Sequence, residues 1–299
     1  MNRGRMGMCL GYSNLYPQTQ CVLDGHHRGA HRDREGSEFF HTGGGFWHNV
    51  IAMSEPRRGT TNLSALALPK EVIAELTASR ERAVHHHAVP VNPAWWQAAL
   101  AENGLPGGPV IPDGRDDTDG VTLSRGAVFN LGIAVSEASS DEEVLGFLWH
   151  VLAWGARGRN NRRRLRSVAD LMPGAAELLR QACLAARDDP VMGYEVLRTN
   201  GRSNAIPWLG PAFLTKVLYF AGGGASGHRA LILDDRVAAA LSDHGWWSLR
   251  TGGNWPSATY QRYCDLLTRW AREASEEVGR EVASDELELW LFRQGPGRK

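Results

Sequence analysis

The sequence predicts a mainly α-helical protein with a short N-terminal segment of different composition. From Leu63 onward, apolar residues recur at the spacing of amphipathic helices, and strand-like stretches are few. Residues 1–60 are instead rich in Gly, His and Arg and lack helical periodicity. We therefore expect two parts, a Cys/His-rich segment over residues 1–60 and a helical domain over residues 61–299.

Composition limits the possible classes of protein. The chain has 299 residues, 42% of them hydrophobic, which is enough for one large domain with a small appendage. The formal net charge is zero, so an anionic partner must bind to a local basic patch. No apolar run has the length of a membrane span, and the N-terminus lacks the apolar core of a signal peptide. These features predict a cytoplasmic protein without membrane contact, and we expect a monomer.

Turn signals and apolar spacing define the individual elements. Helices are expected over residues 69–84, 91–104, 141–155, 161–170, 174–186, 190–199 and 260–282. The clearest is 141–155, which has acidic residues in its first turn and an apolar body. Residues 105–120 are a surface loop by their Gly, Pro and Asp content. Strands are indicated by VTLSRGAVFNLGIAV and by the alternation of ELELWLF (286–292).

The stretch 206–240 carries the most chemistry. Pro207–Gly210 is a tight turn whose glycine allows close backbone approach, and the helix after it exposes N–H groups that can bind phosphate. Lys216 lies in that helix. The apolar run 231–233 then leads to Asp234, at the N-cap position of the next helix. A purely structural alternative remains, in which Asp234 only caps a helix and Lys216 only extends its charge to water.

This stretch resembles the helix-hairpin-helix DNA glycosylases, the superfamily of endonuclease III, the adenine-mismatch glycosylase and 8-oxoguanine glycosylase. Their hairpin (here residues 206–220) reads roughly L-P-G-V-G, and their catalytic aspartate lies in an apolar segment before a helix, as in LILDDRV. The likeness covers about residues 125–245 and is strongest to bacterial proteins with an 8-oxoguanine glycosylase fold. It implies a helix-hairpin-helix glycosylase fold with Asp234 as the catalytic carboxylate, and Asp235 as the second choice.

The same resemblance suggests a role for Lys216 and contains one departure. Eighteen residues separate Lys216 from Asp234, a separation typical of the lysine-bearing members. In those members, however, the lysine follows the last hairpin glycine, here Gly210, by two positions, and that position is Ala212. Because Lys216 lies one turn later on the same helix face, we expect it to reach the site as a Schiff-base nucleophile. Gly210 and Ala212 are expected to contact DNA.

The chemistry explains why these groups are needed. Cleavage of an N-glycosidic bond builds positive charge on the sugar, which a carboxylate stabilises. Attack by water leaves an abasic site, whereas attack by a lysine amine gives an imine that can proceed to strand cleavage. In both cases the base must first leave the helical stack, which requires a pocket and a group to fill the gap.

An arginine-rich loop and nearby aromatic residues are candidates for these two tasks. The resemblance places the loop against double-stranded DNA, with Asn160 or Asn161 in the vacated space and arginines on phosphates; the candidates are Arg157, Arg159, Asn160, Asn161, Arg162 and Arg163. A solvated basic loop is the alternative. The helix before the loop carries Trp149, His150 and Trp154, which we expect to shape the base pocket, although core packing is the better explanation for at least one of them.

The N-terminal segment contains a potential metal site. Cys9, Cys21, His26 and His31 supply two thiolates and two imidazoles, enough for a structural zinc site, and His27 is an alternative to His26. CVLDGHHRGAHRD resembles small Cys/His modules of bacterial proteins, and so few apolar residues favour folding around a metal. A disordered tail is the alternative. The clustered cysteines of an iron–sulfur site are absent from the sequence, since Cys264 stands alone.

Together these features predict a DNA glycosylase that excises a modified base. The substrate is expected to be an oxidised purine or a hypermodified phage base, in DNA repair or in anti-phage defence. Two alternatives stay open. One is a non-catalytic DNA-binding module that uses the hairpin and the arginine loop, and the other is a nucleotide- or RNA-modifying enzyme on the same scaffold.

Overall fold

The computed structural model describes residues 30–32, 38–42, 46–49, 60–155, 160–199 and 203–296. The chain forms two compact units, Met1–Thr60 and Thr61–Lys299. In the first unit, strands β1 (Ala30–Arg32), β2 (Glu38–Thr42) and β3 (Phe46–Asn49) form an antiparallel sheet in that order. The sequence pattern gave no indication of these strands.

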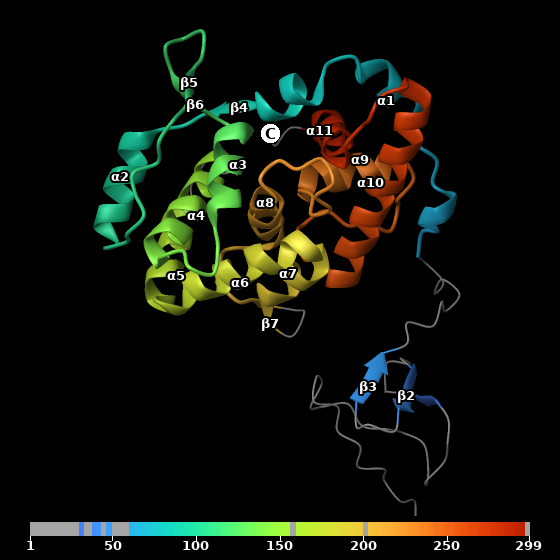
Figure 1. The fold of residues 1–299 in the computed structure, drawn as a ribbon, viewed down its shortest axis with the longest axis horizontal. Helices are drawn as coiled ribbons and strands as arrows, with labels where there is room; N and C mark the ends of the chain where they lie inside the picture. The colour runs from blue at the N-terminus through green and yellow to red at the C-terminus, as the bar shows by residue number, and fades with distance from the viewer. Residues whose placement is uncertain are drawn as a thin grey trace, which may run out of the picture. The chain divides into compact units, whose positions relative to one another are not determined.

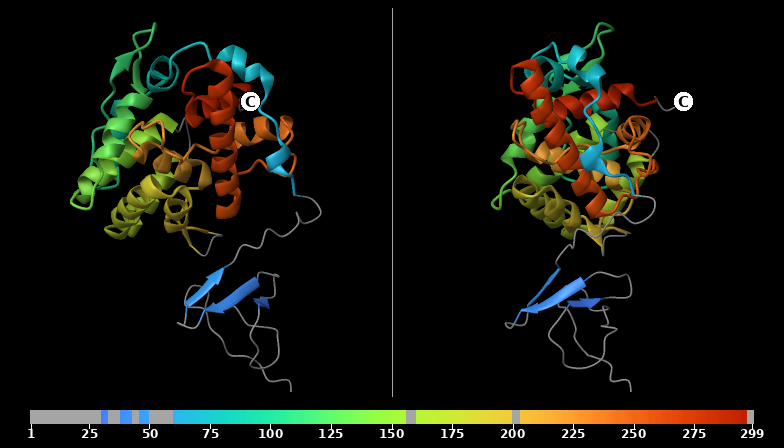
Figure 2. Two further views of the ribbon diagram at one scale, coloured as in Figure 1. Left: turned by 45° about the vertical axis from the view of Figure 1, so that its right-hand side comes forward. Right: turned by 90° about the vertical axis from the view of Figure 1, so that its right-hand side faces the viewer.

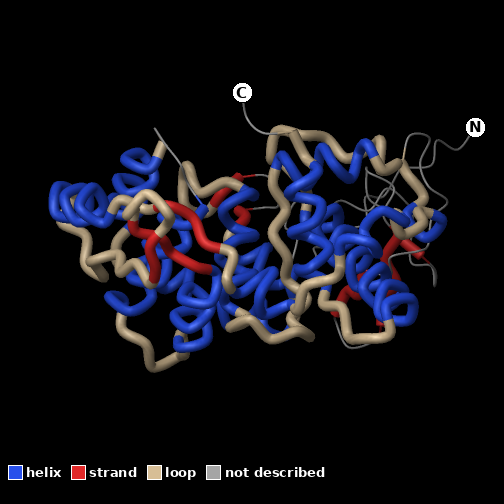
Figure 3. The backbone as a smooth tube through the Cα atoms, turned by 90° about the horizontal axis from the view of Figure 1, so that it is seen from above, coloured by secondary structure: helices blue, strands red, loops and turns tan. Residues whose placement is uncertain are grey.

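The second unit is mainly helical, as the sequence predicts (Figure 1). Its helices are η1 (Leu63–Ala65), α1 (Lys70–Glu75), η2 (Glu81–His85), α2 (Pro93–Glu102), α3 (Arg125–Ala134), α4 (Asp141–Gly155), α5 (Asn161–Leu171), α6 (Gly174–Asp188), α7 (Pro190–Val196), α8 (Pro211–Ala221), α9 (Asp235–Asp243), α10 (Ser257–Val278) and α11 (Ser284–Gln294). The few strands are short (Figure 3). They are β4 (Ala88–Pro90), β5 (Gly114–Arg115) and β6 (Val121–Ser124) in the order β4-β6-β5, and the pair β7 (Arg198–Thr199) and β8 (Ser203–Asn204). Among the described helices, none is long and apolar enough to cross a membrane.

Helix α8 lies at the centre of this unit. It packs against α3, α4, α6 and α7, and the views in Figures 1 and 2 place it between this group and the group formed by α9, α10 and α11. Close approach to α3 depends on Gly132, because any Cβ atom there would overlap the carbonyl oxygen of Phe220. Leu214, Val217 and Leu218 of α8 are fully buried. The helix that carries Lys216 is therefore held rigidly by the core.

Three sequence-based assignments need correction. The helix expected over 69–84 is broken after α1, which ends at Glu75, and resumes as the separate turn η2. The strand expected over 121–135 is limited to β6. At Ser124 the side chain accepts a hydrogen bond from the N–H of Ala127 and starts α3, so the N-cap overrides the apolar run.

The third correction concerns residues 286–292, which form part of helix α11 rather than a strand. The alternation of acidic and apolar residues suggested a strand with one polar face. In the structure Glu286 and Glu288 are both buried, because Arg280 and Arg125 form ion pairs with them. Because these acids are buried as ion pairs, acidic and apolar residues can alternate within a helix that is enclosed on most sides.

Candidate active site

A tight turn begins the candidate site. The N–H of Leu209 donates to the carbonyl oxygen of Ile206 (3.2 Å), and Gly210 then forms the N-cap of α8 without any side-chain cap. Pro211 occupies the first helical position, where its missing N–H costs nothing. The predicted turn and the helix after it are therefore present, with Gly210 at the N-cap and Ala212 in the first turn of α8.

Lys216 is buried and bends back toward the start of α8. Its aliphatic chain passes Gly155, where an added Cβ atom would lie 2.7 Å from Cδ of Lys216. Its ammonium group donates to the carbonyl oxygen of Ala212 (3.1 Å) and to Oδ2 of Asp234 (3.3 Å). The ammonium therefore lies level with Ala212, the position of the lysine in the proteins that this stretch resembles. Lys216 lies one helical turn later in the sequence than that lysine, and its side chain extends back over this turn.

Asp234 is the N-cap of α9, and both of its carboxylate oxygens have partners. Oδ1 accepts hydrogen bonds from the N–H groups of Arg236 (3.0 Å) and Val237 (3.2 Å), while Oδ2 faces Lys216. Burial pushes the pKa of Asp234 upward. The positive charge of Lys216 and the backbone donors outweigh burial, so the net pKa lies below its usual value. Asp234 is consequently ionised at neutral pH.

The segment that delivers Asp234 is fixed from both sides. Thr215, next to Lys216, exchanges hydrogen bonds with the backbone of Leu233: its hydroxyl donates to the carbonyl (3.2 Å) and accepts from the N–H (3.1 Å). From α10, Tyr263 donates to the carbonyl oxygen of Ile232 (2.7 Å). The separation between Lys216 and Asp234 is thus set by neighbours of both residues. Asp235, the second choice for the carboxylate, instead accepts from the N–H of Gly252 (2.9 Å).

The arginines of α5 contact the turn at the start of the site. Arg164 donates to the carbonyl oxygen of Trp208 (3.1 Å) and stacks on Phe213, and the guanidinium of Arg163 lies 4.6 Å from the ring centre of Trp208. Asn161 is buried and accepts from Arg164 (2.7 Å), whereas Asn160 is exposed. Arg162 is exposed, and Arg157 and Arg159 lie outside the described residues. Of the two asparagines expected to fill a vacated space, Asn160 alone is at the surface.

The three residues expected to shape a base pocket separate into two groups. Trp149 donates to the carbonyl oxygen of Pro106 (2.7 Å), and both ring nitrogens of His150 are engaged by backbone groups, Ile111 and Gly146. These two side chains therefore hold the loop that follows α2. Trp154 instead packs against Phe220 of α8 and against His87, next to the glycine that accommodates Lys216.

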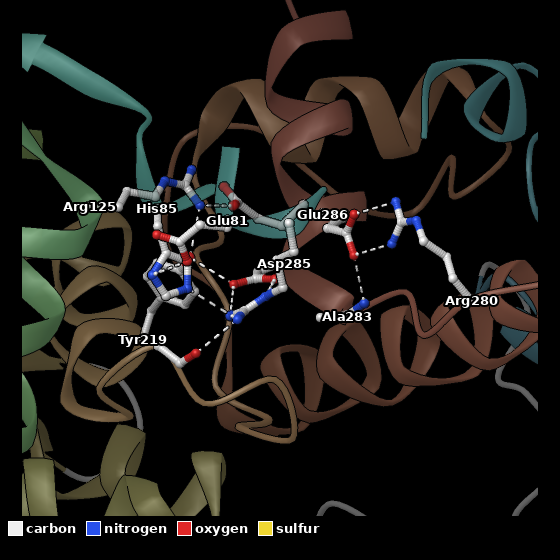
Figure 4. Close-up of polar contacts among 11 residues, drawn as sticks. Glu81, His85, Arg125, Tyr219, Arg280, Ala283, Asp285 and Glu286 are labelled. Atoms are coloured by element: carbon white, nitrogen blue, oxygen red, sulfur yellow. Dashed lines mark hydrogen bonds and ion pairs between the residues drawn. The ribbon is translucent and has the colours of Figure 1, made fainter. Parts of the chain in front are cut away.

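A buried polar network one turn further along α8 was missed by the sequence analysis (Figure 4). The hydroxyl of Tyr219 accepts from Arg125 (2.9 Å) and donates to Asp285 (3.0 Å). Arg125 pairs with Glu288 (2.8 Å), and Arg80 pairs with Asp285 (2.7 Å). The only sequence signal was the pair of acids in ELELWLF, whose alternation with apolar residues indicated a strand.

Burial raises the pKa of Glu288, and nearby acidic groups, Asp234 among them, add to the rise against the opposing charge of Arg125. The network is therefore electrostatically coupled to the candidate catalytic carboxylate. Burial lowers the pKa of His87 to about 3, assisted by the charge of Arg125, so this ring is neutral at physiological pH. Its Nδ1 atom has no hydrogen-bond partner among the described residues.

The expected zinc ligands fall largely outside the described residues. This holds for Cys9, Cys21 and His26, while His31 lies in β1, of which the backbone alone is described. In the described ranges no group of three or more His, Cys, Asp or Glu residues is arranged to hold a metal. Cys183 and Cys264 are both buried free thiols, and burial raises the pKa of each to about 12.

The helical unit holds a buried lysine–aspartate pair beside the turn Ile206–Leu209, as expected of a glycosylase-like protein, and comparison with protein families agrees. Residues 82–292 match the family model described as "Putative 8-oxoguanine DNA glycosylase OGG-like protein". The chain belongs to this family, which confirms the resemblance seen in the sequence and assigns it a DNA glycosylase type of function. Neither the search of curated proteins nor that of solved structures found a match.

Proposed function

We propose that the chain is a DNA glycosylase in which Asp234 stabilises the positive charge that develops on the deoxyribose when the bond between C1′ and the base is broken. The observation that carries this proposal is the ion pair between Lys216 and Asp234, 3.3 Å long, buried behind the hairpin. A carboxylate with a lowered pKa stays negative at neutral pH, as charge stabilisation requires. Attack of water at C1′ then completes hydrolysis and leaves an abasic site.

Lys216 has two possible roles in this reaction. As an ammonium it keeps Asp234 ionised and oriented. After losing a proton, its Nζ can attack C1′, expel the base and form an imine that leads to strand cleavage. The geometry supports either role, because the same nitrogen contacts Asp234 and lies level with Ala212.

The partner we propose is double-stranded DNA, bound by a monomer in the cytoplasm. The first turn of α8 and the exposed arginines of α5 lie on neighbouring elements, since Arg164 bridges them. Backbone N–H groups at a helix start and guanidinium groups are both phosphate ligands. Substrates remain of two kinds, an oxidised purine in repair or a hypermodified base of phage DNA in defence.

Mass spectrometry of bases released from several genomic DNAs, phage DNA included, tests the proposal. We expect the unaltered chain to release one modified base and Asp234→Asn to release at least about 100-fold less, since one charge-stabilising group is worth that much. Asp235→Asn is the matched control, because its amide can still accept from Gly252. The glycosylase proposal fails if no DNA yields free base or abasic sites, and a non-catalytic DNA-binding module then becomes the better explanation.

Borohydride trapping separates the two roles of Lys216. The chain has only three lysines, Lys70, Lys216 and Lys299, so a covalent adduct is easily mapped to a peptide. If Lys216 is the nucleophile, Lys216→Ala abolishes the adduct while Lys70→Ala, at an exposed position of α1, leaves it intact. Base release without any adduct assigns attack to water.

Zinc binding by the N-terminal segment also remains a proposal. It rests on the four potential ligands Cys9, Cys21, His26 and His31. Metal analysis of the purified full chain is expected to give one zinc per molecule, reduced to a small fraction by the double variant Cys9→Ser/Cys21→Ser. A zinc content that this variant leaves unchanged contradicts the site.

A further inference from the structure

The turn before α8 contains an unusual residue. In the turn Ile206–Leu209, Pro207 is followed by Trp208 with φ +64°. A turn with proline at its second position and a positive φ at its third normally has glycine or asparagine there. A bulky side chain in this backbone conformation is uncommon and costs energy. The tryptophan therefore occupies a position at which glycine would adopt the observed backbone conformation with the least strain.

Packing does not account for this tryptophan. Ile206 and Leu209, the first and last residues of the turn, are fully buried, whereas Trp208 is 50% exposed. Its carbonyl oxygen accepts a hydrogen bond from Arg164 (3.1 Å), which fixes the backbone of the turn while the side chain stays half exposed. In the part of the chain that the structure describes, the guanidinium of Arg163 is the only group that stacks on the ring.

The surroundings of the indole favour an anionic, flat partner. Arg163 is exposed and has no acidic partner among the described residues, and Arg162 and Arg166 on the same helix are exposed as well. A guanidinium stacked on an indole combines a π surface with a positive charge. Nucleobases in single strands stack on such surfaces while arginines bind the adjoining phosphates.

We propose that Trp208, backed by Arg163, is a stacking platform for an unpaired nucleobase of the DNA strand held by the hairpin. This base is distinct from the one that reaches Asp234, because Trp208 is 50% exposed, whereas the Asp234 side chain is 16% exposed and is paired with Lys216 and with the N-terminal N–H groups of α9. The inference rests on the proposed function only in taking DNA as the ligand. It does not depend on base excision.

Trp208→Gly gives a test in which stability and binding respond differently. Glycine adopts φ +64° without strain, so the midpoint of thermal unfolding is expected to stay the same or rise. Affinity for a single strand and for a duplex with a one-nucleotide bulge, measured by fluorescence anisotropy, is expected to fall about tenfold, the effect typical of losing one stacked base. The affinity for a fully paired duplex of the same length is expected to fall by less than about threefold. Phenylalanine keeps an aromatic face, so Trp208→Phe should retain most of the affinity for the bulged duplex.

Trp247→Ala is the matched control, because this second tryptophan is 62% exposed on the segment after α9 and has no ring contact with an arginine in the described ranges. It should leave binding of all three DNAs unchanged. Unchanged affinity of Trp208→Gly overturns the proposal, as does an equal loss on paired and bulged duplexes, which would indicate a backbone contact. Failure of Trp208→Phe to rescue binding also overturns it. If no base is ever released but this binding pattern holds, the glycosylase proposal fails and the stacking platform stands.

Discussion

Two buried ion pairs lie beside α8, and they differ in how completely they are enclosed: Lys216 of α8 pairs with Asp234, and Arg125 of α3 pairs with Glu288 of α11 next to Tyr219, one turn further along α8. Lys216 and Asp234 are 3.3 Å apart with 7% and 16% of their side chains exposed, whereas Arg125 and Glu288 are 2.8 Å apart with 1% each. Both oxygens of Asp234 have partners. In the enclosed pair, Nε of Arg125 and Oε1 of Glu288 have no hydrogen-bond partner among the described residues.

This difference is the one expected if the first pair serves the proposed chemistry and the second serves the structure. In the longer and slightly exposed pair, Asp234 can separate from Lys216 when a substrate binds. Its negative charge would still be stabilised by the two backbone N–H groups that donate to it. The enclosed pair has no such alternative, since removing one member leaves an isolated charge in the core. We therefore expect the first pair to matter mainly for activity and the second mainly for stability.

Replacing the cation of each pair, in separate variants, gives the largest expected contrast in stability. Arg125→Met is expected to lower the free energy of unfolding by about 3–5 kcal/mol, because Glu288 loses its buried partner. Lys216→Met, the matched change, is expected to cost less, about 1–3 kcal/mol, since Asp234 keeps two backbone donors and its side chain is 16% exposed. Urea unfolding at pH 7 measures both values, and similar losses for the two variants would remove the distinction.

A double replacement sharpens the same comparison. Arg125→Met combined with Glu288→Leu takes away both charges, so most of the loss in the single variant should be recovered. A double variant as unstable as Arg125→Met would mean that packing or Tyr219, rather than the stranded carboxylate, is responsible.

Acid stability tests whether His87 belongs to the enclosed region. Its pKa in the folded chain is about 3, below the ordinary 6.5, so between these values the unfolded state holds a proton that the folded state lacks. Stability from this group is therefore full above pH 6.5 and falls as the pH falls. Between pH 7 and pH 5, the free energy of unfolding should therefore fall by about 1–2 kcal/mol less in His87→Phe than in the unaltered chain.

The lowered pKa of Asp234 acts in a different window, because its contribution is present above about pH 4 and is lost only below it. His150 and His228 also have lowered pKa values, caused first by burial, so they contribute equally to both chains in this experiment. Parallel pH profiles for the unaltered chain and His87→Phe would show that His87 titrates normally when folded.

Sequence reasoning located the open pair and missed the enclosed one, and the reason is physical. Asp234 and Lys216 belong to local signals, an N-cap after an apolar run and a helix after a glycine turn, which act over a few residues. Arg125 and Glu288 are 163 positions apart, and only the tertiary fold brings them together. A buried glutamate cannot be distinguished from an exposed one when its cation lies so far away in the chain.

The same limit affected secondary structure. Helices α4, α5, α6 and α9 were predicted closely, because acidic first turns, prolines and apolar spacing mark them. Helix α11 was mistaken for a strand since its acids are buried. The contact of Lys216 with Ala212 follows from the four-residue period, but the space for its side chain depends on Gly155, in a different helix.

Gly155→Ala is the smallest change that tests whether the position of the Lys216 side chain matters, as distinct from its presence. An alanine Cβ would lie 2.7 Å from Cδ and 3.1 Å from Cε of Lys216, so the side chain must shift while the ion pair keeps both of its members. The nearest atoms belong to the flexible end of the lysine, which can shift at low cost, so the net change in stability should be below about 1 kcal/mol. Base release should nevertheless fall by about tenfold if the proposed reaction needs Lys216 in its present position, because displacement of a reacting group by about 1 Å can cost that much. Gly174→Ala, at the start of α6 where an added Cβ meets nothing within 4 Å, is the matched control and should leave base release unchanged. Normal activity in Gly155→Ala would mean that Asp234 works without a precisely placed Lys216, and the lysine would then serve only to keep the carboxylate charged.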